Sequence, residues 1–272
     1  RRRQRQMCIR DRFKKGLVSA TKTSGHTLQI ADGLWLDKKF KAAMMKSIAQ
    51  SELDRKRFVY SDIGFILLQQ VVEAVTGKTL DAYLVSEFYR PMGLEHTLFQ
   101  PLNRYKKADI MPTAANDYLR RQDLCGYVHD EAAAFMGGVS GNAGLFSTAQ
   151  ELGKIYQMIL NEGELDGKRY LRPETCRIFT TEKSAVSHRG LGYDKPNLKD
   201  PKANACASSA PASVYGHTGF TGTCAWVDPE NDLVYIFLSN RLCPDAWNGK
   251  LNSMKIRQAV QEVIYQSLYT PE

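Results

Sequence analysis

The chain has 272 residues, of which 43% are apolar, and its formal net charge is +8. That apolar fraction suffices for a folded core, and no apolar run approaches the ~20 residues of a membrane-spanning helix. The five histidines and six cysteines are scattered, without an H-E-x-x-H or C-x-x-C arrangement. We therefore expect no metal, no other cofactor, no membrane span, and cysteines that are buried free thiols.

The first residues carry almost all of the excess positive charge. Residues 1–15 hold eight Lys or Arg and one Asp, which leaves +1 for the remainder of the chain. A dense basic arm can bind nucleic acid or an acidic membrane. Residues 1–12, however, have no apolar face and no initiating Met at their start, and they resemble translated adapter sequence at the edge of an assembled fragment. We expect a non-native arm over 1–12, a domain over 13–272, and no nucleic-acid partner.

Helical patterns dominate the first two thirds of the chain, and strand patterns its end. Thr148 and Glu151 have the spacing of a capping box. The helices are predicted, in chain order, over residues 38–50, 61–75, 80–89, 148–161, 173–179 and 253–268. The core-facing stripes are predicted to be Leu152, Ile155, Tyr156 and Ile159 in one helix, and Ile256, Val260, Val263 and Ile264 in the last. Together these patterns favour an α+β fold with helices against an antiparallel sheet.

Tyr60 directly precedes one of these helices. Ser61 and Asp62 are good N-cap residues, and Gly77 is a good residue to end the helix in the left-handed conformation. Tyr60 should then project from a loop at a helix N-terminus, where the positive end of the helix dipole favours the ionised phenol. Such a phenol suits proton transfer, although Tyr60 taken alone could equally be an ordinary packed aromatic residue.

A glycine-rich segment near the end of the chain is the second candidate for a site. It reads Gly216-His217-Thr218-Gly219-Phe220-Thr221-Gly222-Thr223 and precedes two strand-like runs, 224–227 and 233–238, joined by a five-residue turn over 228–232. Glycines at a strand start let a ligand or another backbone approach closely, but they can also serve only to form a bulge or tight turn.

The order Tyr60-Ser61-Asp62, then His217-Thr218-Gly219, resembles the second and third motifs of the penicillin-recognising serine hydrolases, the class C β-lactamase and esterase family. Residues 128–131, 137–148 and 189–196 are also similar to segments of that family. The likeness is strongest to the β-lactamase-like domain fused behind a family 3 glycoside hydrolase. It implies a β-lactamase/transpeptidase-like α+β fold, an antiparallel sheet flanked by helices with the C-terminal helix packed on it, and a periplasmic or secreted location.

The resemblance also assigns roles to residues. Tyr60 would act as general base and acid beside a serine nucleophile. Asp62 stands where the family has Asn, and a carboxylate cannot donate a hydrogen bond to a substrate amide oxygen, which disfavours efficient β-lactam hydrolysis. His217 would orient a substrate carboxylate or the Tyr60 oxygen. Thr218 and Gly219 would contact the substrate, and the N–H of Phe220 would supply half of the oxyanion hole.

The family's nucleophile is the serine of an S-x-x-K motif, whose lysine lies one helical turn later. Upstream of Tyr60 the chain has one such motif, from Ser19 to Lys22. The residues after Lys22 are turn-forming and lack helical periodicity, so we interpret this match as a coincidence. The expectation is a domain that lacks its N-terminal part and, with it, the nucleophile.

The parent protein would hydrolyse an amide or ester bond of a small molecule or peptide through an acyl-enzyme, and the chain itself would be inactive. The alternative is a non-catalytic domain that binds peptidoglycan-like ligands, or serves as the partner of a glycoside hydrolase fused upstream.

Overall fold

The computed structural model describes residues 16–52, 59–181 and 183–269. The chain forms two compact units, and each is described here by itself. The first takes in the chain up to Ser86, Leu98–Phe146 and Cys243–Ala246. The second takes in Glu87–Thr97, Ser147–Leu242 and the chain from Trp247 on. The predicted basic arm, residues 1–12, lies outside the described residues.

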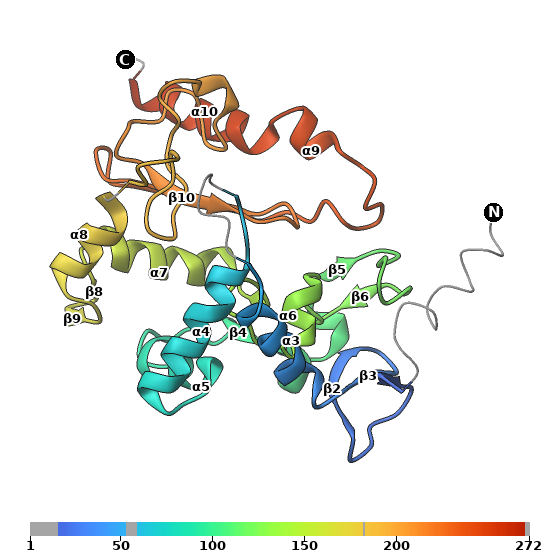
Figure 1. The fold of residues 1–272 in the computed structure, drawn as a ribbon. Coiled ribbons are helices and arrows are strands. Elements are labelled where there is room, and N and C mark those ends of the chain that lie inside the picture. Colours follow the sequence, from blue (N-terminus) through green and yellow to red (C-terminus); the bar gives the residue numbers. More distant parts are fainter. Residues whose placement is uncertain (1–15, 53–58, 182, 270–272) are drawn as a thin grey trace. The chain divides into compact units, whose positions relative to one another are not determined.

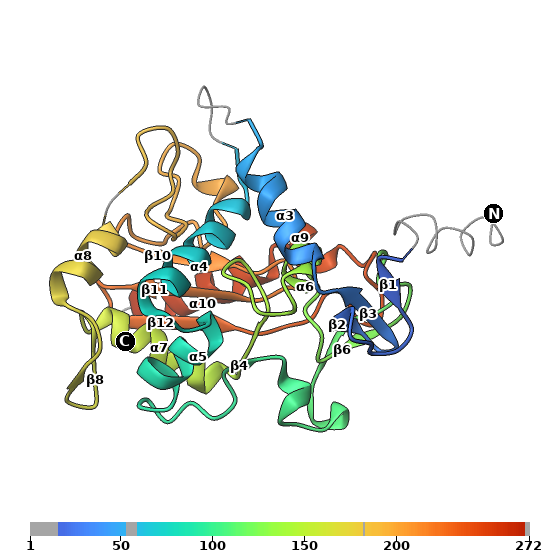
Figure 2. The same cartoon turned by 60° about the horizontal axis from the view of Figure 1, so that its bottom comes forward.

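A small antiparallel sheet opens the first unit. β1 (Val18–Ser19), β3 (Leu34–Asp37) and β2 (His26–Ala31) lie side by side in that order, as Figure 2 shows in blue. Ile30 and Leu36 are fully buried and form a core with residues of the short helix α6 (Glu131–Phe135). The strands predicted for the end of the chain are therefore not the full set, because β1 and β3 are too short to show a clear alternation.

Short elements make up most of the rest of the first unit. α3 (Phe40–Ala49) falls within its predicted range. The others are α4 (Ile63–Thr76), α5 (Leu80–Leu84), the two-stranded sheets β4 (Leu98–Phe99) with β7 (Leu145–Phe146) and β5 (Pro112–Ala114) with β6 (Leu124–Cys125), and the 3-10 turns Pro101–Asn103 and Lys107–Asp109. The predicted helix over 80–89 continues beyond α5 as a π-helical turn, Val85–Tyr89, which crosses into the second unit.

Helix α4 has the predicted ends, with Asp62 at its N-cap and Gly77 in the left-handed conformation, φ 67°, at its C-cap. One side of α4 is closely covered by the loop around Gly141. A Cβ on Gly141 would lie 2.2 Å from the Phe65 carbonyl oxygen, so only glycine fits there. Gln69 is buried on the same side, where it donates to the Val139 carbonyl oxygen at 3.3 Å and accepts from the Gly141 N–H at 3.2 Å.

The second unit is built on an antiparallel sheet of β10 (Tyr215–Thr218), β11 (Cys224–Asp228) and β12 (Leu233–Phe237), in that order. Asp228 pairs with Leu233, so four residues join the last two strands instead of the predicted five. The other elements are α7 (Ala149–Leu160), β8 (Glu164–Leu165), β9 (Lys168–Arg169), α8 (Pro173–Thr181), α9 (Lys250–Ser253), α10 (Ile256–Tyr269) and the 3-10 turn Pro201–Ala203.

Helices lie on both faces of this sheet (Figure 1). Val234 and Ile236 of β12 face α7. Trp226 and Tyr235 face the opposite way and form a core with Tyr265 of α10. The C-terminal helix therefore packs on the sheet, as the family resemblance implies.

The face that α10 turns to the core agrees only in part with the prediction, because Ile264 packs against the core whereas two other predicted residues are exposed. Val260 and Val263 are 39% and 59% exposed, whereas Gln261 and Tyr265 are buried. Gln261 accepts from the Ala207 N–H at 2.8 Å, and the Tyr265 hydroxyl donates to Asp228 at 2.8 Å. Specific hydrogen bonds to buried partners, which a hydrophobic pattern does not reveal, thus decide the orientation of the helix.

Helix α7 begins with half of the predicted capping box. The Thr148 hydroxyl accepts from the Glu151 N–H at 3.3 Å. The Glu151 carboxylate instead accepts from the N–H groups of Glu95 and His96, at 2.8 and 2.9 Å, and from the Thr97 hydroxyl at 2.6 Å. Burial alone would raise the pKa of Glu151, but these hydrogen bonds outweigh it and hold the pKa below its usual value.

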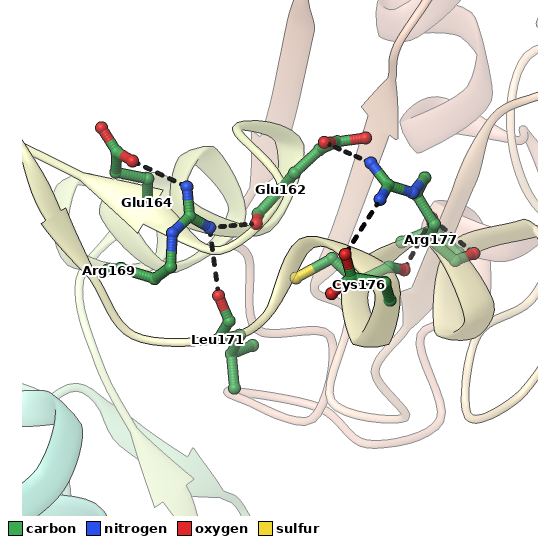
Figure 3. A network of polar contacts seen from close by, with 8 residues as sticks. Glu162, Glu164, Arg169, Leu171, Cys176 and Arg177 are labelled. Atoms are coloured by element: carbon green, nitrogen blue, oxygen red, sulfur yellow. Dashed lines mark hydrogen bonds and ion pairs between the residues drawn. The ribbon is translucent and has the colours of Figure 1, made fainter.

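Two arginines make polar contacts with Glu162, which lies between α7 and β8 (Figure 3). Arg169 donates to the carbonyl oxygens of Glu162 and Leu171 and to the Glu164 carboxylate. Arg177 of α8 donates to the Glu162 carboxylate at 2.7 Å. These side chains are about half exposed, so each ion pair adds little stability by itself, while the carbonyl contacts fix the geometry of the turn.

Candidate functional site

Tyr60 lies at the N-terminus of α4, where the sequence predicts it. It belongs to a segment without regular secondary structure that leads into the helix, and its side chain is 56% exposed. The Ser61 hydroxyl accepts from the Ile63 N–H at 3.3 Å, whereas the Asp62 side chain makes no capping hydrogen bond to the helix. Ser61 therefore takes the capping role, and Asp62, at the N-cap position, is not used for it.

His217 and Thr218 end strand β10, which lies at one edge of its sheet. On one side β10 pairs with β11, with His217 opposite Ala225 and Thr218 opposite Cys224. On the other side, within the described residues, it meets an isolated bridge in which Asp194 and Gly216 exchange both backbone hydrogen bonds, at 2.7 and 3.1 Å. Backbone groups alternate along a strand, so Thr218 presents its N–H and C=O to the same outer side as Gly216.

Gly219 and Phe220 belong to the tight turn that joins β10 to β11. The Gly219 N–H donates to the Thr223 carbonyl oxygen at 2.7 Å, and the Gly222 N–H donates to Gly219 at 3.1 Å. Gly222 has a φ of 118°, which L side chains rarely adopt. The exposed Phe220 ring lies at the tip, with the Arg241 guanidinium 4.2 Å from its centre. The geometry of the turn itself thus accounts for the glycines in this segment.

Both ring nitrogens of His217 have polar partners. Nδ1 lies 2.7 Å from the Thr218 carbonyl oxygen, which can only accept a hydrogen bond. Nε2 lies 2.9 Å from Arg189 Nη1, which can only donate one. His217 thus bridges the end of strand β10 to Arg189, whose guanidinium brings a positive charge to this strand end.

Arg189 is the functional candidate that the search for motifs missed. A second contact places its Nη2 3.4 Å from the Asp194 carboxylate, which also lies 2.9 Å from His188 Nε2. A quarter of the Arg189 side chain remains exposed. The family resemblance of residues 189–196 gave a signal for this segment, but the pairing with His217 spans 28 residues of sequence and needs the fold.

A buried lysine lies beside the same strand. Lys195 Nζ contacts the Thr180 carbonyl oxygen and lies 5.7 Å from the ring centre of Tyr215. Burial lowers the pKa of Lys195 to about 8, and burial raises the pKa of Tyr215 above its usual value. Lys195 thus packs against β10 in the interior of the second unit.

The S-x-x-K match from Ser19 to Lys22 has no helical geometry. Ser19 is in strand β1, paired with Trp35, and its hydroxyl accepts from the Thr21 N–H at 3.3 Å. Lys22 Nζ lies 5.6 Å from the ring centre of Trp35. A serine and a lysine share a face at this spacing only in a helix, so the geometry of the motif is absent here.

Tyr60 and Asp62 belong to the first unit, and the four residues His217, Thr218, Gly219 and Phe220 belong to the second. In the part of the chain that the structure describes, no group of three or more His, Cys, Asp or Glu side chains could hold a metal ion. No helix of that part is long and apolar enough to cross a membrane. Its cysteines are free, and all but Cys243 are buried.

Comparison with known proteins gives one family. The family model described as "Beta-lactamase" matches residues 20–257. A "Putative D-alanyl-D-alanine carboxypeptidase" from Escherichia coli (strain K12) is 38% identical over 197 residues, which cover 68% of this chain and 45% of the relative. A protein of the same name from Salmonella gallinarum (strain 287/91 / NCTC 13346) is 32% identical over 227 residues, 78% of this chain and 52% of the relative. The chain spans about half the length of the curated relatives it matches.

Solved structures share the fold at low sequence identity. A penicillin-binding protein homologue from Caulobacter crescentus has a TM-score of 0.51 and 19% identity, over 74% of this chain and 58% of that one. An octameric penicillin-binding protein homologue from Pyrococcus abyssi has a TM-score of 0.54 and 18% identity, over 86% and 52%. A β-lactamase from Mycobacterium bovis has a TM-score of 0.53 and 18% identity, over 97% and 82%. The predicted β-lactamase/transpeptidase-like α+β fold is confirmed.

Proposed function

Because the chain belongs to the β-lactamase family of serine hydrolases, we propose that it is the substrate-binding part of an acyl hydrolase that cleaves a peptide amide next to a free carboxylate. The name of the Escherichia coli relative, "Putative D-alanyl-D-alanine carboxypeptidase", supports a cell-wall peptide ending in D-Ala-D-Ala as the substrate. Esters of similar shape are the second substrate class.

The observation that carries this proposal is the pairing of Arg189 with His217 beside the open edge of β10. An extended peptide can add to a strand edge through main-chain hydrogen bonds, and the Thr218 N–H lies on this outer side, while the Thr218 carbonyl oxygen already accepts from His217. A guanidinium matches a carboxylate with two parallel hydrogen bonds. Arg189 lies 2.9 Å from the side chain that precedes Thr218, so a peptide on this edge would have a cation within reach of its C-terminal carboxylate.

The reaction requires a serine, with Tyr60 as its general base and acid. The serine Oγ forms a bond to the carbonyl carbon while the amide C–N bond breaks, and the serine proton passes through the Tyr60 oxygen to the leaving nitrogen. Water then attacks the acyl carbon, its proton returns through Tyr60 to the serine Oγ, and the acid is released. The Phe220 N–H would supply one donor to the oxyanion, at the tip of the turn after β10.

We further propose that the nucleophile does not come from Ser19. The strand conformation of β1 supports this, because Ser19 and Lys22 lack the helical geometry that lets a lysine activate a serine. The chain alone is therefore catalytically inactive and needs a serine and lysine supplied by another segment.

The alternative is a binding domain that holds cell-wall peptides without cleaving them, including as the partner of a glycoside hydrolase fused upstream. The open edge of β10 serves this function equally well. Adding the segment that carries the nucleophile distinguishes the two proposals, because a non-catalytic binding domain would still hydrolyse no substrate.

The proposed substrate can be tested by binding alone. Isothermal titration should show that a peptide ending in D-Ala-D-Ala binds at least about tenfold more tightly as the free acid than as the C-terminal amide, since the guanidinium contact is worth at least ~1.4 kcal/mol. Arg189→Gln should abolish that difference, and Arg189→Lys should restore part of it. Arg177→Gln, which removes a half-exposed arginine of the same unit, is the matched control and should keep it. Equal binding of acid and amide by the unmodified chain would refute carboxylate recognition.

A further inference from the structure

The first unit contains a pocket of about 320 Å³ beside β2, an edge strand of its sheet. That volume equals about ten water molecules of the liquid, so the pocket has room for a molecule of roughly monosaccharide size. Buried residues of the core, Ile30, Val128 and Ala134, line one part of it. Its lining, as far as the structure describes it, includes none of the candidate site residues. The pocket is therefore a separate feature of this unit, and its interpretation does not rest on the proposed function.

The lining of the pocket carries a positive charge. Lys22 is the charged side chain among the described lining residues, which include no Asp and no Glu. Lys22 is exposed, and within the described parts of the chain no carboxylate forms an ion pair with its ammonium group. This group can donate three hydrogen bonds and accept none. The lining thus favours a ligand with an anionic group and disfavours a cationic one.

An aromatic ring borders the pocket beside this charge. Trp35 of β3 is half-buried and lies directly opposite Gln29 of β2, so the two side chains point to the same face of the sheet. Lys22 Nζ lies 5.6 Å from the centre of the Trp35 ring. The indole offers a large, flat, apolar surface on which the C–H groups of a sugar ring can pack. A cation, an indole ring and an amide therefore come together in the lining.

The amide side chains of the lining are held through their nitrogen atoms. The Gln29 amide N–H donates to the Ala31 carbonyl oxygen at 3.3 Å, and the Asn103 amide N–H donates to Gln100 Oε1 at 3.0 Å. Among the described residues, no donor bonds to the side-chain oxygen of Gln29 or of Asn103. These oxygens can only accept hydrogen bonds, so they suit hydroxyl groups of a ligand.

Gln100 lines the pocket in a strained backbone conformation. Its φ of 49° and ψ of 57° are left-handed, a region that residues other than Gly, Asn and Asp seldom adopt. Its side chain donates to the Gly137 carbonyl oxygen and accepts from Asn103. Such strain persists only where the surroundings fix it, and it occurs most often at ligand sites and other functional positions. Asn103 is therefore positioned at the pocket by a neighbour that is itself fixed.

We propose that this pocket binds an acidic sugar, that is, a monosaccharide unit that carries a carboxylate. The carboxylate would pair with Lys22, one face of the sugar ring would pack on Trp35, and hydroxyl groups would donate to the lining amides. A free amino acid also has a carboxylate, but its ammonium group would meet no negative charge in the described lining. A neutral sugar would leave the Lys22 ammonium group without an anion.

The test titrates the whole chain with glucuronate, glucose and cyclohexanecarboxylate in separate isothermal titrations. Glucuronate should bind with 1:1 stoichiometry and a dissociation constant on the order of 1 mM, as the small number of its atoms allows. Glucose lacks the carboxylate, and cyclohexanecarboxylate lacks the hydroxyl groups. Each of these two should bind at least about tenfold more weakly than glucuronate.

Variants assign the binding to the pocket. Lys22→Met should raise the dissociation constant of glucuronate at least about tenfold, whereas Lys22→Arg should keep most of the affinity, because it keeps the charge. Trp35→Ala should weaken binding more than Trp35→Phe, which retains an aromatic face. Lys38→Met, which removes an exposed lysine of the same unit outside the described lining, is the matched control and should bind as the unmodified chain does. Circular dichroism melting should show that the lysine variants, all at exposed positions, are folded.

Several results would overturn the proposal. They are glucose or cyclohexanecarboxylate binding as tightly as glucuronate, Lys22→Met binding as tightly as Lys38→Met, and the absence of any binding. Tighter, Lys22-dependent binding of L-phenylalanine would assign the pocket to amino acids and would also overturn it. Arg189→Gln should leave glucuronate binding unchanged, and Lys22→Met should leave the preference for the peptide acid over its amide unchanged. The acidic-sugar proposal and the proposed function can therefore fail independently.

Discussion

Helices α4 and α7 show two different relations between sequence and packing. α7 is amphipathic, and none of its large apolar residues is exposed, since its apolar face meets strand β12. α4 is longer and apolar nearly all round, yet only the side that holds Ile66 and Gln69 is covered. An amphipathic helix thus identifies a single packing face, whereas a uniformly apolar helix indicates a second one. In α4 that second face, here called the stripe, is formed by the exposed residues Ile63, Leu67, Leu68, Val71 and Val75.

Truncation of residues on the two sides of α4 should give the largest contrast. Ile66→Ala removes a fully buried side chain and should lower the free energy of unfolding by about 2–4 kcal/mol. Leu68→Ala, at a 57% exposed position, should cost less than about 0.5 kcal/mol. Urea denaturation measures both. Equal losses would mean that the stripe is already packed in this chain, and the comparison with α7 would no longer hold.

Removing the buried charge at the start of α7 should have the next largest effect. Glu151→Gln should lower the free energy of unfolding by about 2–3 kcal/mol at pH 7, because the carboxylate accepts three short hydrogen bonds. The pKa of Glu151 is lower in the folded protein, so this stability is present above the unfolded pKa of about 4.5 and is lost as the pH falls through the folded value.

Denaturation curves of Glu151→Gln at pH 7 and below pH 4 check the sign of this effect. The difference in the free energy of unfolding between Glu151→Gln and the unmodified protein should become smaller in acid. Glu164→Gln is the control, because its carboxylate is exposed and paired with Arg169, and it should change stability by no more than about 0.5 kcal/mol. If the difference in the free energy of unfolding became larger in acid, the role assigned to the Glu151 carboxylate would be contradicted.

Lys195→Met should have a smaller effect, visible as a pH dependence. The folded pKa of about 8 lies below the ordinary value of 10.5, so the folded state binds fewer protons between these pH values. From pH 8 to 10 the unmodified protein should therefore gain about 2 kcal/mol of stability relative to the variant. Thermal or urea denaturation at both pH values tests this, and parallel curves would show that the amine titrates normally.

The local parts of the fold could be predicted from the sequence. The ends of α4 follow from Asp62 and Gly77, and the start of α7 follows from Thr148, because caps depend on neighbouring residues alone. The core-facing side of α10 could not be predicted, because Gln261 and Tyr265 find their partners 54 and 37 residues away in sequence. The sheet of β1, β2 and β3 was not predicted from the sequence, because strands as short as β1 and β3 carry little periodic signal.

The candidate site likewise has a part that follows from the local sequence and a part that does not. The position of Tyr60 at a helix N-terminus follows from a local motif, whereas the strand β10, which His217 and Thr218 end, was not among the predicted strands. The partner of His217 does not follow from a local motif either, because Arg189 reaches it through the bridge between Asp194 and Gly216, which only the fold creates. Arg189, which the search for motifs missed, brings a positive charge beside His217.

The most direct test of the account is the intact mass of the purified, folded chain after incubation with a fluorescent penicillin and with a fluorophosphonate, alongside Ser19→Ala. We predict no mass increase in the chain alone, because Ser19 lies in a strand and has no activating lysine on a shared helix face. A single adduct that disappears in Ser19→Ala would contradict the account. It would make Ser19 the nucleophile and the chain an active hydrolase by itself.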